Sequence, residues 1–123
     1  MFHAAGFRFS KNIGRTMENT VAVELLRRRS YAKKDLELFY WKDYEGREVD
    51  FLVKEKTKIK QLIQVSFVSS EDEINERELK ALIRASKETK CRDLILITWD
   101  YEDKRKIKNQ TIKFIPLWRW LIS

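Results

Sequence analysis

The chain has 123 residues with 43% hydrophobic content, three glycines and one proline, which predicts one folded domain with short loops and excludes a disordered chain. One cysteine, Cys91, excludes an internal disulfide and a cysteine metal cluster, and a lone histidine, His3, argues against His-ligand zinc sites and Ser-His-Asp catalysis. The net charge of +7 favours nucleic acid or another polyanion as a partner, and the 37% content of charged residues is typical of thermophiles.

The first half of the chain predicts a helix followed by a β-hairpin. Residues 1–9 are an apolar, aromatic-rich lead, either an edge strand or a remnant of a preceding domain. Ser10 is a suitable cap, and apolar side chains at helical spacing predict a helix from Lys11 to about Arg29. The strands predicted at 36–41 and 47–53 are separated by a turn that contains a glycine, so we expect them to pair as a hairpin.

The second half predicts strands and helices in the order of an α/β domain. A basic connection leads to a more apolar, and therefore more central, strand at 61–68. A capping box at Ser70–Glu73 predicts a helix that ends near Thr89. The remaining segments are a buried strand at 93–99, a charged turn at 101–109, a last strand at 111–115 and a helical turn from Pro116. We therefore expect a single α/β domain over 1–123, with a mixed central sheet of about four to five strands flanked by helices.

Three polar residues lie where buried strands should be apolar. Alternation places Asp50 on the same strand face as Leu52, and it places Gln64 and Ser66 together on one face of the next strand. Glu18 lies at the edge of the apolar stripe of the first helix. Because carboxylate and amide oxygens are ligands for Mg²⁺ or Mn²⁺, the pattern indicates the layout of a metal-dependent phosphodiesterase site.

Each of these residues also has a purely structural explanation. Glu18 could bond a nearby backbone group or Arg15, and Asp50 could form a salt bridge with a lysine or arginine at a sheet edge. Gln64 and Ser66 could form a polar pair that is satisfied inside the fold. The sequence leaves these alternatives open.

The motifs that contain these residues also resemble a known family. Glu18-Asn19, Gly46–Phe51, Ile63–Ser66 and the helix Arg77–Leu82 follow one another as in the C-terminal domain of archaeal AAA+-type ATPases, a member of the PD-(D/E)XK nuclease superfamily. The resemblance extends from about Arg8 to the C-terminus. It implies a restriction-endonuclease-like fold, related to Holliday-junction resolvases, with a magnesium or manganese site. No ATP-binding loop occurs in the sequence, so an ATPase domain would be a separate part or partner.

The resemblance also implies roles for particular residues. Glu18, Asp50 and Gln64 take the places of the metal ligands, but Gln64 replaces a glutamate and Ser66 replaces the catalytic lysine. The loss of both charges predicts weak metal binding and weak or no cleavage. Lys80, on the helix after the third strand, is the candidate for a borrowed lysine. The candidate catalytic residues are therefore Asp50, Gln64, Ser66 and Lys80.

A basic stripe offers a candidate nucleic-acid contact. It consists of four residues at helical spacing, Arg77, Lys80, Arg84 and Lys87. The stripe is either a solvated helix face held by ion pairs or a surface that contacts phosphates.

Three functions follow as hypotheses. The first is a nuclease-like domain with a degenerate Gln-x-Ser site that binds DNA or docks on an ATPase-type protein, with weak or no cleavage. The second is an active Mg²⁺-dependent endonuclease of the resolvase kind, and the third is a protein-interaction domain without nucleic acid. In each case the aromatic ends leave room for a homodimer. The lack of a signal peptide or long apolar run predicts a cytoplasmic protein without a membrane partner.

Overall fold

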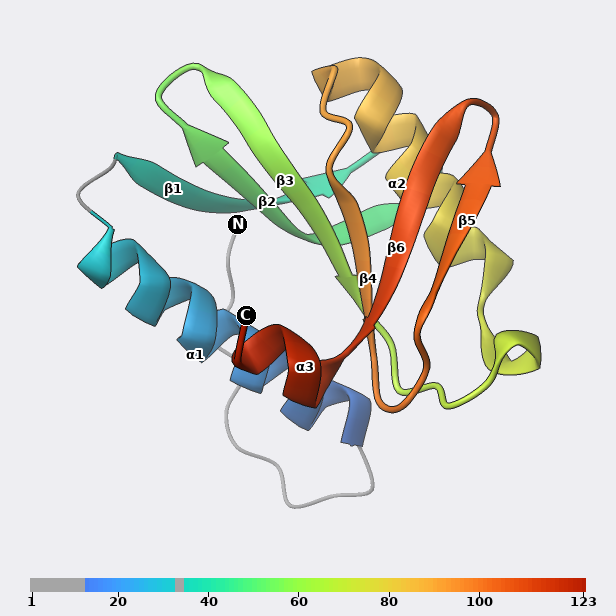
Figure 1. Ribbon diagram of the computed structural model, residues 1–123. Helices are drawn as coiled ribbons and strands as arrows, with labels where there is room; N and C mark the ends of the chain where they lie inside the picture. Colours follow the sequence, from blue (N-terminus) through green and yellow to red (C-terminus); the bar gives the residue numbers. More distant parts are fainter. Residues whose placement is uncertain (1–12, 33–34) are drawn as a thin grey trace.

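The computed structural model describes residues 13–32 and 35–123, which form an open sheet with helices on both faces (Figure 1). The expectations for 1–9, Ser10 and Lys11 lie outside these described residues. The elements, in chain order, are α1 (Ile13–Tyr31), β1 (Leu36–Lys42), β2 (Glu48–Glu55), β3 (Lys58–Val65), the 3₁₀ turn η1 (Glu71–Glu73), α2 (Glu76–Thr89), β4 (Leu94–Thr98), β5 (Asp103–Ile107), β6 (Gln110–Pro116) and α3 (Leu117–Leu121).

The sheet has six strands in the order β1-β2-β3-β4-β6-β5. The central strands β3, β4 and β6 are parallel, because α2 forms the crossover between β3 and β4, and the outer pairs are antiparallel. The expected α/β class, mixed sheet and first hairpin are confirmed. The segment 54–60, predicted as a basic connection, instead holds the end of β2, the start of β3 and the two-residue turn 56–57 of a second hairpin, where Lys56 takes a left-handed φ of 57°.

Strand β5 lies in the segment that the sequence predicts to be a charged turn. It pairs antiparallel with β6 at the edge of the sheet. Charged side chains suit an edge strand, which faces solvent along one side. Lys108 and Asn109, both with positive φ, form the two-residue turn to β6. This strand has no apolar alternation, so the hydrophobic pattern of the sequence does not predict it.

Helix α2 begins later than the capping box predicts. Ser70 precedes only the short turn η1, and its hydroxyl donates to the Glu73 carboxylate at 2.9 Å. The chain then passes through the extended residue Ile74, and the Asn75 side chain caps α2 by accepting from the Arg77 N–H at 2.9 Å. The predicted end of the helix at Thr89 is confirmed.

Two apolar cores lie on the two faces of the sheet. One joins α2 to the sheet through residues such as Leu62, Leu82 and Phe114, and the other joins α1 and α3 to the opposite face through Met17 and Ile63. Figure 1 shows α2 on the far side of the sheet and α1 and α3 on the near side. No helix among the described residues is long and apolar enough to cross a membrane.

The last turn of α1 holds α3 in place. The Arg28 guanidinium donates to the Trp120 carbonyl at 2.8 Å and lies 4.4 Å from the centroid of the Trp120 ring. Glu24 accepts from the same guanidinium at 2.7 Å, and its contacts with Arg27 and Arg28 lower the pKa of Glu24 to about 2. These contacts close the α1–α3 layer over one face of the sheet.

Candidate functional site

Strands β2 and β3 diverge at Asp50 and Gln64. Their backbone pairing begins at Phe51 and Ile63, and before Phe51 the two strands are joined by side chains instead. The Asp50 N–H donates to Gln64 Oε1 at 3.0 Å, and the Val65 N–H donates to Asp50 Oδ2 at 2.8 Å. The two polar side chains thus satisfy backbone groups that the diverging strands no longer pair.

A β-bulge directs Asp50 into this gap. Asp50 and Phe51 of β2 both stand opposite the single residue Tyr40 of β1. As a result, Val49 packs with Leu52 in the core beneath α2, whereas Phe51 packs on the side of α1. The simple alternation that places Asp50 on the face of Leu52 is therefore interrupted at this point.

Gln64 ties three elements together. Its side chain is 1% exposed, and its Nε2 donates to the Glu48 carbonyl of β2 at 2.7 Å and to the Glu78 carbonyl of α2 at 3.2 Å. With Oε1 accepting from Asp50, both ends of the amide bond the backbone. These are the contacts of a polar residue satisfied inside the fold.

Ser66 and Glu78 form a second polar contact beside Gln64. Ser66 follows β3 directly, and its hydroxyl donates to Glu78 Oε1 at 3.1 Å. Burial raises the pKa of Glu78, the Ser66 hydroxyl lowers it, and the charge of Glu18 raises it. Sequence reasoning missed Glu78. Its signal is the one that identified Glu18, a carboxylate at the border of the apolar stripe of a helix.

Glu18 and Asp50 are adjacent carboxyl groups. Burial, followed by the charge of Glu18, raises the pKa of Asp50 to about 8, although the Val65 N–H opposes the shift. A hydrogen bond with Glu18 and the charge of Glu78 raise it further. Asp50 is therefore protonated at neutral pH and forms a hydrogen bond with Glu18. No lysine or arginine of the described ranges forms the salt bridge that the sequence offered as an alternative for Asp50.

Lys80 does not lie with these residues. It is exposed, whereas Glu78, two positions earlier on α2, points toward Ser66. Two residues correspond to a rotation of about 200° around an α-helix. The structure thus brings Glu18, Asp50, Gln64 and Ser66 to one region and leaves Lys80 on the outer side of α2.

The two arginines of the basic stripe of α2 contact the turn between β1 and β2, and Arg84 is ion-paired there. Arg84 lies 3.4 Å from the Glu45 carboxylate, and Arg77 donates to the Gly46 carbonyl at 3.5 Å. Both partners belong to the turn between β1 and β2. The two lysines of the stripe are exposed and remain available to a partner.

The residues present fit a three-ligand metal site poorly. In the described part of the chain, no group of three or more His, Cys, Asp or Glu side chains is arranged to hold a metal ion. Glu18 and Asp50 offer two carboxyl groups, but the amide oxygen of Gln64 is bonded to the backbone. Mg²⁺ is often held by one or two carboxylates with water and substrate phosphates completing its shell, so this pair suits a weak divalent site only.

The comparisons with known proteins assign most of the chain to one family. Residues 13–120 match the model of a family described as a domain of unknown function, DUF4143. The chain is 40% identical over 121 residues to an uncharacterised protein of Methanocaldococcus jannaschii, with 94% of this chain and 26% of that protein covered. The chain thus spans about a quarter of the length of this curated relative. No solved structure matches this chain. Because the family model extends from the start of α1 into α3, the chain belongs to the DUF4143 family.

Proposed function

We propose that this domain is a nuclease-like module that binds nucleic acid, with weak or no cleavage, within a longer ATPase-type protein. The observation that carries the proposal is the position of the Gln64 amide, which bonds β2 and α2 where a metal-binding carboxylate is implied by the resemblance. Ser66 bonds Glu78 and supplies no ammonium to offset the charge of a phosphate. The polar framework is present, but it lacks the charges that phosphodiester cleavage requires.

Nucleic acid is the partner that the charge of the chain favours. The net charge is +7, and Lys80 and Lys87 are exposed on the outer side of α2. Cations at such positions contact phosphates without reading sequence. Support for a longer protein comes from the Methanocaldococcus jannaschii relative, of which this chain covers 26%. The ATPase part of the proposal rests on the resemblance of the motifs.

An active endonuclease is the second candidate, and one observation favours it. Protonated Asp50 forms a hydrogen bond with Glu18 at a half-buried place. A divalent cation at the same pair would replace that proton and remove the repulsion between the two carboxylates. Both candidate functions therefore predict DNA binding, but only the second predicts efficient DNA cleavage.

Binding is tested by fluorescence anisotropy with labelled duplex and branched DNA over a salt series. We expect the logarithm of the affinity to fall linearly with the logarithm of the salt concentration, with a slope of about −0.9 for each phosphate contacted. The double variant Lys80→Ala/Lys87→Ala is expected to bind more weakly because it loses two exposed cations. No binding at low salt by a protein that is folded by circular dichroism would refute the proposal and favour a protein-interaction domain.

A further inference from the structure

The half of the sheet formed by β4, β6 and β5 leaves part of one face without a described helix over it. Leu94, Ile112 and Phe114 on these strands point into the core beneath α2. The alternate positions therefore emerge on the opposite face. Figure 1 shows that α1 and α3 lie lower on this face, so that the upper parts of β6 and β5 carry no helix on the near side.

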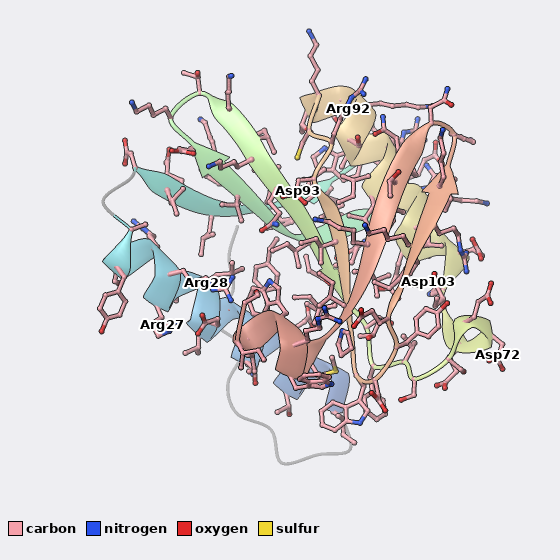
Figure 2. All side chains as sticks on the ribbon, viewed as in Figure 1. Arg27, Arg28, Asp72, Arg92, Asp93 and Asp103 are labelled. Carbon is pink, nitrogen blue, oxygen red and sulfur yellow. The ribbon has the colours of Figure 1, made fainter. Side chains whose placement is uncertain are left out.

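An open pocket of about 420 Å³ lies on this face. It is lined by Arg92, Asp93, Lys104, Thr111 and Lys113. Arg92 and Asp93 precede β4, and Figure 2 places Arg92 near the upper end of the sheet with Asp93 below it. Three cations against one carboxylate leave the lining with a surplus of positive charge.

Two lysines of the lining oppose each other directly. Lys104 of β5 and Lys113 of β6 are partners in the antiparallel ladder, and like charges in that position destabilise a sheet. Lys113 lies 3.4 Å from Asp93 Oδ1, and Asp93 Oδ2 accepts from Gln61 Nε2 at 3.1 Å. Within the part of the chain that the structure describes, no carboxylate forms a salt bridge with Lys104 or Arg92. The pocket therefore holds two cations whose charge is uncompensated.

We propose that this pocket binds a phosphate group. The Arg92 guanidinium and the Lys104 ammonium are the charged donors for its oxygens, and the Thr111 hydroxyl is a neutral donor at the same place. A bound anion would also relieve the repulsion between Lys104 and Lys113. The phosphate is either part of a nucleic-acid backbone, in which case the inference rests on the proposed function, or part of a free polyphosphate.

The test is an NMR titration of the ¹⁵N-labelled chain with pyrophosphate and, separately, with a short DNA duplex. Pyrophosphate is expected to shift the amide signals of Arg92, Thr111 and Lys113 saturably, whereas sodium chloride at the same ionic strength leaves them unchanged. The variant Arg92→Ala/Lys104→Ala is expected to bind pyrophosphate on the order of tenfold more weakly. The matched control Arg29→Ala/Lys58→Ala also removes one arginine and one lysine, at exposed positions outside the pocket lining, and should bind pyrophosphate as the wild type does.

The two ligands separate the possible sources of the phosphate. If DNA also shifts these signals, and Arg92→Ala/Lys104→Ala reduces the salt slope of DNA binding by about one to two, the pocket contacts the nucleic-acid backbone. Saturable pyrophosphate binding without DNA binding would support the phosphate site and show that its ligand is a free polyphosphate. The same result would refute the proposed function. DNA binding that does not shift the amide signals of the pocket, together with no saturable response to pyrophosphate, would refute the phosphate site. The proposed function would still stand.

Discussion

Replacement of Gln64 by leucine is expected to lower the free energy of unfolding by about 3–5 kcal/mol, which is large for a side chain of similar volume. The variant leaves the Asp50 N–H and the Glu48 carbonyl without the Gln64 amide at a buried place, and it removes the additional bond of the Glu78 carbonyl, which lies inside α2. Each unsatisfied buried group destabilises by about 1–3 kcal/mol. Urea unfolding monitored by tryptophan fluorescence measures the difference.

Two further variants test whether the loss of stability comes from the hydrogen bonds of Gln64. Gln61→Leu on the same strand removes a half-buried amide with one hydrogen bond, to Asp93, and is expected to destabilise by about 1 kcal/mol. Gln64→Glu keeps the shape but loses the donor to both carbonyls and adds a charge beside Asp50. It should therefore destabilise at neutral pH about as much as Gln64→Leu. Equal, small losses in Gln64→Leu and Gln61→Leu would contradict the structural role of Gln64.

Asp50→Asn is expected to stabilise the domain at neutral pH, by several kcal/mol. The pKa of Asp50 is raised from 3.8 to about 8, and each pKa unit corresponds to about 1.4 kcal/mol. The introduced amide has the hydrogen-bonding capacity of the protonated carboxyl group, because it accepts from the Val65 N–H and can donate to Glu18.

The pH dependence gives the sign of this effect. Below about pH 4 the carboxyl group is protonated in the folded and the unfolded chain, and its contribution to stability is fully present. As the pH rises toward 8, the unfolded chain releases the proton while the folded chain retains it, so the free energy of unfolding falls. The stability difference between Asp50→Asn and the wild type should therefore grow from pH 4 to pH 8 and then level off.

Asp103→Asn supplies a control of opposite sign. The Tyr101 hydroxyl donates to Asp103 and lowers its pKa, so this exposed substitution should not stabilise the domain at neutral pH. A stability difference between Asp50→Asn and the wild type that stays constant from pH 4 to pH 8 would show that Asp50 has an ordinary pKa.

Most of the fold follows from hydrophobic periodicity and turn residues. The helices, the first hairpin and the buried strand before Trp99 lie close to where apolar spacing predicts them. Strand β5 does not, since an edge strand tolerates charge on both faces and carries no apolar pattern. The start of α2 depends on a choice between two capping segments, and the burial of Ile74 between them is a tertiary effect.

The candidate site was only partly predictable from the sequence. Polar residues in apolar strands identified Asp50, Gln64 and Ser66, and the border of a helix stripe identified Glu18. The orientation of the Gln64 amide could not be predicted, because it depends on the bulge at Asp50 and on the distance to α2. Lys80 illustrates the same limit, since its helix does pass beside the site but turns Glu78 toward it instead.

The domain proposed above holds nucleic acid with weak or no cleavage. The most direct measurement incubates end-labelled duplex and branched DNA with the protein and Mn²⁺, then analyses one half of each sample on a native gel and the other on a denaturing gel. We expect retarded complexes on the native gel and intact strands on the denaturing gel, with wild type and with Asp50→Ala. Mn²⁺-dependent cleavage by the wild type that disappears in Asp50→Ala would contradict the claim and identify an active endonuclease.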